Sequence, residues 1–330
     1  MRLLAEPKQP HDALFKKTFS EVEHAAAEFR AVLPAELVAR TDFSTLALRP
    51  GSYIDEALSG SQSDLLFSVQ IAAKPALLYV LFEHQSSVDK LMPLRLLRYV
   101  IRILERHLDE AKSAGTALPL PIVIPVVLHH GEAGWSGPAR VEELFDTELV
   151  AEAGLSDLVP RLSFILDDLS HVTDDELERR ALGLVPVLTL WALRDARNPT
   201  RLSMSLGRWA ATMATLLQAP NGREALWTIF RYIALVADDT VVGTLSKALD
   251  AAQPEVKDAL MTLAEKWQAE GEARGRSKEK AETLRKLLTL KFGELTEPVV
   301  HRIATASDAE LDRWVERVLT ADTLDQVIGS

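Results

Sequence analysis

The sequence predicts an α/β domain to about residue 170, followed by helices only. Strand-like runs rich in β-branched and aromatic residues occupy 64–71, 76–82 and 122–128. After residue 170 the pattern changes, because Thr173 begins a capping box and the chain to about 260 reads as helices only. We therefore expect an α/β domain over 1–170, a helical region over 171–262 and a C-terminal helical module over 263–330.

Residues 10–40 are typical of short helices. Ser20 and Glu23 have the spacing of a capping box, which predicts that a helix begins there. The dipeptides Pro50-Gly51 and Ser59-Gly60 predict turns between 41 and 63.

The runs 64–71 and 76–82 flank Ala72-Ala73-Lys74-Pro75, which suits a tight connection and predicts a hairpin. The second run is apolar throughout, which predicts a central strand buried on both faces. Pro125 lacks an amide donor and predicts an edge or a bulge in the run 122–128, and 163–166 is expected to be a last short strand. Residues 93–112 predict a helix with one apolar stripe. The stripe is Leu94, Leu97, Ile101, Leu104 and Leu108.

Composition narrows the class of protein. Hydrophobic residues make up 47% of the 330 positions, so a sizeable core is expected. There are no cysteines, which excludes disulfides and thiolate metal sites. No apolar run is long enough to span a membrane and no signal core opens the chain, so we expect a cytoplasmic protein. The net charge of −11 argues against nucleic-acid binding over the whole surface, but it allows a local basic patch.

Two acidic residues mark the ends of the predicted hairpin. If the hairpin is centred between Ala73 and Lys74, Asp64 lies directly opposite Glu83, with Cβ atoms roughly 4.5–5.5 Å apart. Gln85 is two residues further on and points the same way in an extended strand. Two carboxylates at this distance can bind one hard cation such as Mg²⁺.

Such an ion would polarise a phosphoryl oxygen and lower the pKa of bound water, which is what phosphodiester hydrolysis needs. The alternative is that Asp64 begins a strand and Glu83 ends one, both at the solvent.

Several segments, in order, resemble a known family. They are Pro10-His11-Asp12 with Phe15-Lys16-Lys17, Leu48-Arg49-Pro50-Gly51-Ser52-Tyr53-Ile54-Asp55-Glu56, Ser63-Asp64-Leu65-Leu66-Phe67, Leu81-Phe82-Glu83-His84-Gln85-Ser86-Ser87, Leu91-Met92-Pro93-Leu94-Arg95-Leu96-Leu97-Arg98-Tyr99 and Val127-Leu128-His129-His130-Gly131. Together they resemble the recombination-promoting nuclease, or putative transposase, family of the PD-(D/E)XK nuclease superfamily over roughly 10–170. Residues 287–295 resemble a small helical domain often appended to such proteins.

This resemblance implies a restriction-endonuclease-like core with a mixed central sheet and divalent-metal cleavage of DNA. It implies that Asp64 and Glu83 are the metal ligands and that Gln85 stands where most of the superfamily has lysine. Glutamine can orient water or a phosphate oxygen but supplies no positive charge. Asp12 matches an N-terminal motif and is an accessory acid or a helix cap. Asp55 is a further candidate at the metal.

Other residues allow two interpretations. A row of arginines at helical spacing follows the proposed site and is either a phosphate track or a solvated face paired with Glu105 and Asp109. The row is Arg95, Arg98, Arg102 and Arg106. His129 and His130 are adjacent and should point opposite ways, which favours packing over metal binding. Asp167-Asp168 fits a turn and helix-cap role better than a second acidic site.

Three functions remain open. The first is a Mg²⁺-dependent DNA endonuclease acting in recombination or mobile-element biology. The second is an inactive nuclease fold that binds DNA or assembles into a complex, and the third is a regulatory oligomerisation protein. We also expect a homodimer or higher homo-oligomer, because the apolar edges of the C-terminal helices would be hard to bury in so small a module. The alternative is that these edges pack onto 174–260.

Overall fold

The structure is a computed structural model that describes residues 9–50, 64–83, 88–112, 118–237, 256, 276–277 and 279–329. The chain divides into two compact units, 1–257 and 258–330. No helix among the described residues is long and apolar enough to cross a membrane.

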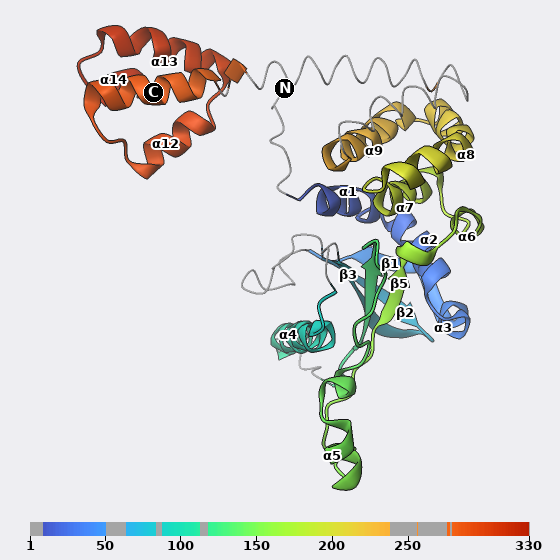
Figure 1. The fold of residues 1–330 in the computed structure, drawn as a ribbon. Helices are drawn as coiled ribbons and strands as arrows, with labels where there is room; N and C mark the ends of the chain where they lie inside the picture. Colours follow the sequence, from blue (N-terminus) through green and yellow to red (C-terminus); the bar gives the residue numbers. More distant parts are fainter. Residues whose placement is uncertain are drawn as a thin grey trace. The chain divides into compact units, whose positions relative to one another are not determined.

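The first unit is built on a five-stranded sheet in the order β1-β2-β3-β4-β5 (Figure 1). The strands are β1 (Thr41–Leu48), β2 (Leu65–Ile71), β3 (Lys74–Glu83), β4 (Ile122–His129) and β5 (Ile165–Asp168). Strands β1, β2 and β3 pair antiparallel, whereas β3, β4 and β5 pair parallel. The mixed sheet confirms the predicted α/β class.

Two details of the sheet follow from sequence. Strand β3 is central, and Leu78 and Tyr79 within it are fully buried, as its apolar run predicts. Pro125 lies in β4 before the pairing with β5 begins at Val126, so its missing amide falls where β4 has a neighbour on one side only. Strand β1 was not predicted, and its pairing with β2 is irregular between Asp42 and Ala47.

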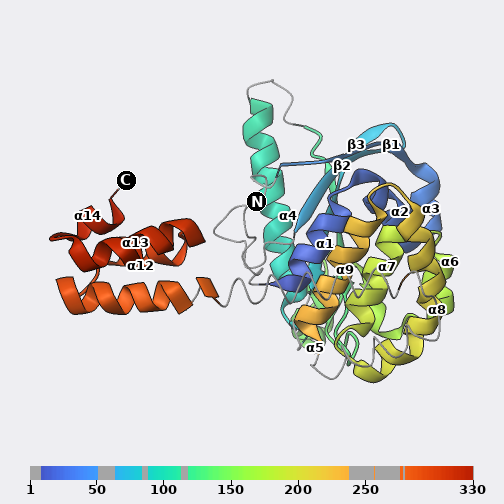
Figure 2. The same ribbon diagram turned by 90° about the horizontal axis from the view of Figure 1, so that it is seen from above.

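Helix α4 (Met92–Lys112) covers one face of the sheet (Figures 1 and 2). Its buried residues pack against strand residues in one apolar cluster. The cluster is Met92, Leu96, Tyr99 and Ile103 with Leu66, Leu77, Tyr79, Val127 and Phe164. The predicted stripe is therefore not the buried one, and in that stripe Leu94 and Ile101 are 43% and 47% exposed.

The opposite face is covered by α1 (Pro10–Phe19) and α2 (Val22–Val32), and α3 (Ala35–Arg40) leads into β1. Phe29 of α2 contacts Phe67 of β2 edge-to-face, with ring centroids 5.5 Å apart. The predicted capping box at Ser20 is wrong. Ser20 ends α1, and Glu21 precedes α2 without a side-chain cap.

The chain between β4 and β5 contains η2 (Val141–Leu144) and α5 (Thr147–Glu152), and η3 (Leu169–His171) follows β5. Four helices come next: α6 (Asp174–Arg179), α7 (Leu184–Asp195), α8 (Pro199–Gln218) and α9 (Gly222–Val236). The capping box at Thr173 is confirmed, since Thr173 and Glu176 exchange the expected hydrogen bonds.

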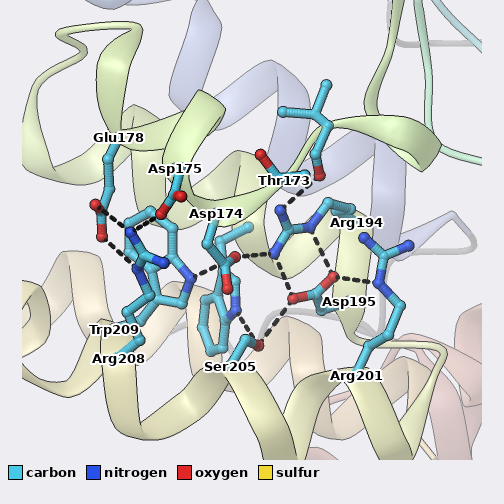
Figure 3. Close-up of polar contacts among 12 residues, drawn as sticks. Thr173, Asp174, Asp175, Glu178, Arg194, Asp195, Arg201, Ser205, Arg208 and Trp209 are labelled. Carbon is cyan, nitrogen blue, oxygen red and sulfur yellow. Dashed lines mark hydrogen bonds and ion pairs between the residues drawn. The ribbon is translucent and has the colours of Figure 1, made fainter.

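A buried polar network joins α6, α7 and α8 (Figure 3). The Arg194 guanidinium, only 3% exposed, binds both oxygens of Asp195 and also Asp174. Ser205 of α8 donates to Asp195 over 2.9 Å and accepts from the Trp191 indole over 2.8 Å. Trp191 and Trp209 are fully buried core residues.

The second unit consists of helical residues 279–292, α12 (Glu297–Ala304), α13 (Asp308–Thr320) and α14 (Leu324–Ile328). Ser307 and Glu310 form a capping box at the start of α13. Leu284 and Leu288 lie in one core cluster with Trp314 and Val318. These apolar edges are therefore buried against one another inside the unit. The argument that they need a partner chain is wrong.

Candidate active site

The hairpin β2–β3 sets the geometry of the proposed site. Its turn is Ala72-Ala73, with φ values of 49° and 60°, and Ile71 pairs with Lys74. Positive φ at both central residues is the backbone of a type I′ turn, which matches the twist of a two-residue hairpin. The pairing then runs to Leu65 opposite Val80.

The expected pairing of Asp64 with Glu83 is therefore wrong by two residues, because this register places position 81 opposite Asp64. A shift of two residues conserves the face of each position. Positions 64 and 83 become diagonal neighbours, a separation of roughly 7–8 Å that long side chains can bridge.

Asp64 is held by a tyrosine from the neighbouring strand. The Tyr79 hydroxyl donates to Asp64 Oδ2 over 2.8 Å, and the two residues are 0% and 8% exposed. Burial, and then the Asp64 carboxylate, raise the pKa of Tyr79 well above its usual value. The tyrosine therefore stays protonated at physiological pH and acts as a constant donor to Asp64.

Helix α4 contributes a second tyrosine and a positive charge to this environment. Burial and the Asp64 carboxylate raise the pKa of Tyr99, whereas the Arg95 guanidinium opposes both effects. Arg95 also forms an ion pair with Asp89 over 3.6 Å. Arg95, the first arginine of the predicted row, and the Asp64 carboxylate thus both act on Tyr99.

Three strands end side by side beyond this hairpin. Glu83 is in register with His129, and His129 is in register with Asp168. His129 is 2% exposed and contacts the Trp135 ring edge-to-face at 5.4 Å. Asp168 accepts from the Trp135 amide over 2.7 Å and from the Ser170 amide over 3.1 Å. This confirms the turn and cap role predicted for Asp168.

His130 and His129 have different neighbours, as expected for adjacent residues at the end of a strand. Its Nδ1 is 3.0 Å from the Leu193 carbonyl oxygen, and its ring lies 5.1 Å from that of His11. Burial lowers the pKa of His130 well below its usual value, so it is neutral at physiological pH. The interpretation as packing residues rather than metal ligands agrees with this geometry.

Asp167 belongs to a buried ion-pair triad that sequence reasoning missed. Arg180 donates two hydrogen bonds to Asp167, over 2.6 and 2.8 Å, and one to Glu28 over 3.0 Å. Burial, and then the neighbouring Asp167, raise the pKa of Glu28 well above its usual value. The triad ties α2 and the residue after α6 to the sheet, and no spacing in the sequence marks it.

The structure describes only some of the remaining candidate residues. Asp12 is buried in the first turn of α1, while the residue before that helix, Gln9, makes no side-chain cap. Of Glu83, only the strand position is described, and Asp55 and Gln85 lie outside the described residues. Within the described ranges, no three His, Asp or Glu side chains are gathered as a metal site. The metal-site assignment stays a prediction.

The arginine row lies on α4 as expected, with Arg98 exposed. Arg102 pairs with Glu105 over 3.2 Å, and Arg106 pairs with Glu110 over 3.4 Å. Both pairs are solvent-exposed and contribute little to stability. They leave the row available for phosphate contacts and do not decide between its two interpretations.

The part of the chain that matches a known family lies within the first unit. The family described as "Putative transposase, YhgA-like" matches residues 9–222. The chain belongs to this family. Proteins named recombination-promoting nucleases are among the relatives of this chain, and no solved structure is a significant match to it.

Three relatives from Escherichia coli strain K12 define the range of similarity. "Recombination-promoting nuclease RpnA" is 31% identical over 80% of this chain and 85% of its own length. "Recombination-promoting nuclease RpnC" is 41% identical over 54% of this chain and 57% of its own length. "Inactive recombination-promoting nuclease-like protein RpnE" is 28% identical over 79% of this chain and 82% of its own length. The relatives of this chain thus include proteins named as nucleases and a protein named as inactive.

Proposed function

We propose that this protein is a divalent-metal-dependent DNA endonuclease that acts in recombination or mobile-element biology. The observation that carries the proposal is the buried Asp64 carboxylate, held by Tyr79 on a hairpin whose second strand ends in Glu83. The Tyr79 hydrogen bond offsets part of the cost of burying this carboxylate, and a buried acid with a second acid on the adjacent strand is a candidate for chemistry. The names of the relatives support a nuclease.

Mg²⁺ is the ion that this donor set suits, because Asp64 and Glu83 would offer hard carboxylate oxygens. When bound, the ion would polarise a phosphoryl oxygen and lower the pKa of a bound water. The protein's own contribution is orientation. Tyr79 holds the Asp64 carboxylate in one direction through its hydrogen bond, which is how outer residues tune metal ligands.

DNA would approach this end of the sheet along α4. Arg95 acts on the same tyrosine, Tyr99, as the Asp64 carboxylate, so we assign it to a phosphate next to the scissile bond. Arg98 and Arg102 continue the row and would contact neighbouring phosphates. Gln85 would orient water or a phosphate oxygen by hydrogen bonding, and Asp12 would act as an accessory acid.

The test is cleavage of supercoiled plasmid by Asp64→Asn, with Mg²⁺ and with EDTA. Asparagine keeps an acceptor for the Tyr79 hydroxyl, so the fold is preserved while the ligand charge is lost. Asp146→Asn is the matched control, because Asp146 caps α5 at an exposed site and asparagine caps equally well. We expect cleavage to be abolished in Asp64→Asn and in Glu83→Ala and retained in the control. Undiminished Mg²⁺-dependent cleavage by Asp64→Asn contradicts the proposal.

A second candidate is a nuclease-like fold that binds DNA or assembles without cutting. One relative, 28% identical over most of this chain, is named inactive, and this supports the second candidate. Under this alternative, the wild-type protein binds duplex DNA but leaves plasmid intact at every Mg²⁺ or Mn²⁺ concentration. The same plasmid assay therefore separates the two candidates.

A further inference from the structure

Helix α4 carries a second apolar face besides the one that packs on the sheet. We call it the outer stripe and define it as Leu94, Leu97, Ile101, Leu104 and Leu108. Leu94 and Ile101 are 43% and 47% exposed, and the other three residues are half-buried. Scattered exposed leucines are ordinary, but five along one helix face form a contiguous patch of the kind that marks an interaction surface.

The spacing of the outer stripe is that of a helix seam. Successive members are three, four, three and four residues apart, which is the a and d pattern of a coiled coil. The residues that face the sheet are a different set, including Leu96, Tyr99 and Ile103. Packing on the sheet therefore does not explain the heptad spacing, whereas packing against another helix does.

Charges beside the stripe indicate which helix that is. With Leu94 as an a position, Arg98 and Glu105 both occupy e positions, one heptad apart, and both are exposed. In an antiparallel pair of identical helices, Leu97 meets the partner's Leu108 and Ile101 meets the partner's Leu104. These two contacts form two successive layers of the seam. Arg98 and the partner's Glu105 both lie between these layers. Two-fold symmetry repeats this pair of opposite charges.

A parallel pairing lacks this complementarity. The e positions would then face the partner's g positions, which are Val100 and His107; Val100 is buried and His107 offers no counterpart of the Arg98–Glu105 pair. The stripe is thus self-complementary in apolar layers and in charge only when the two helices run in opposite directions.

We propose that the outer stripe of α4 binds the outer stripe of a second copy of this chain, in an antiparallel two-fold dimer. The proposal does not depend on the nuclease function. In the dimer Arg98 belongs to the seam, and the phosphate contacts proposed above would then rest on Arg95 and Arg102. One helix from each subunit makes an interface at the low end of the size range, below about 1,200 Å². The dimer should therefore form in the micromolar range of protein concentration.

The first test is the solution mass of the full-length chain by sedimentation equilibrium, from about 1 to 200 µM. We expect a reversible monomer–dimer equilibrium in the wild type and a monomer in Ile101→Asp, because the variant buries a charge at the centre of the seam. Leu149→Asp is the control, since Leu149 on α5 is a comparably exposed leucine, 55% against 47% for Ile101. A wild-type protein that is monomeric throughout, or an Ile101→Asp variant that still dimerises like the control, overturns the proposal.

The second test is a charge exchange. Arg98→Glu converts two attractive pairs into two like-charge pairs, so the dissociation constant should rise roughly tenfold. The double variant Arg98→Glu/Glu105→Arg exchanges the charges and should bring it back to within a few-fold of the wild type. If Arg98→Glu leaves dimerisation unchanged, or if the double variant is weaker than the single one, the antiparallel register is wrong.

The absence of cysteines allows a direct test of orientation. A mixture of Leu97→Cys and Leu108→Cys proteins should form an intermolecular disulfide under mild oxidation. Each variant alone should not, because its two copies of the cysteine would lie roughly 16 Å apart along the helices. Cross-linking of each variant with itself, without preference for the mixture, indicates parallel or random association and overturns the proposal.

Discussion

Tyr79→Phe is the most direct probe of how the protein prepares its proposed metal ligand. The change removes one hydroxyl and keeps the ring, and that hydroxyl donates to Asp64 Oδ2 over 2.8 Å in a buried environment. A hydrogen bond to a charged group contributes about 1.5–3 kcal/mol. Loss of that orientation should weaken divalent-ion binding by about 10–100-fold, the range found for outer residues of metal sites.

The assay is calorimetric titration of Mn²⁺ into DNA-free protein, followed by the Mg²⁺ dependence of plasmid cleavage. Tyr232→Phe is the matched control, because its hydroxyl is also buried and lies 2.8 Å from His11 Nδ1. Both variants should lose stability, but only Tyr79→Phe should lose metal affinity. Equal Mn²⁺ affinity in Tyr79→Phe and wild type would refute the positioning role. A wild type that binds no Mn²⁺ would refute the metal site itself.

Three further predictions concern charge. The double variant Arg95→Gln/Arg102→Gln removes two arginines of the row and spares Arg98, which lies at the proposed dimer seam. It should flatten the salt dependence of duplex binding by roughly two units of logarithmic slope, and an unchanged slope would mean that the row is a solvated face. Because burial raises the pKa of Glu28 above its usual 4.5, the unfolded chain loses this proton first and stability falls as pH rises above that value. Glu28→Gln should therefore gain stability relative to wild type between pH 5 and 8 in urea denaturation, and a constant difference would contradict the shift. Arg194→Leu leaves the 1% exposed Asp195 carboxylate without its main partner and should cost about 3–5 kcal/mol in the same assay. The exposed Arg208→Leu should cost far less, and equal losses would contradict the role of burial.

The order of helices and strands was largely predictable, because hydrophobic periodicity reflects burial directly. The central strand β3, the helix α4 and the capped starts at Thr173 and Ser307 follow from local patterns. Strand β1 was not predictable in this way, because Thr41–Leu48 is a mostly exposed edge strand with an irregular pairing, and only Leu46 in it is buried. An edge strand has little hydrophobic alternation to reveal it.

The register of the hairpin was missed for a specific reason. Two-residue type I′ turns usually carry Asn or Gly, since positive φ is costly for other residues. Here Ala72 and Ala73 adopt it, held by seven cross-strand pairs, so the strongest sequence signal for the turn is absent. Asp64 was singled out from the hairpin spacing and then from the family motif. Its partner Tyr79 was not, because a tyrosine in an apolar run is indistinguishable from core until the strands are aligned.

The position of α1 has a consequence for biosynthesis. This helix packs between the sheet and helices that are made much later, and His11 meets Tyr232 across 221 residues of chain. Lys17 and Thr228 also form a hydrogen bond, across 211 residues. At 5–20 residues per second, the ribosome needs roughly 10–40 s to supply these partners. During that interval one side of α1 stays uncovered on the nascent chain, which makes it a natural substrate for chaperones that bind during translation.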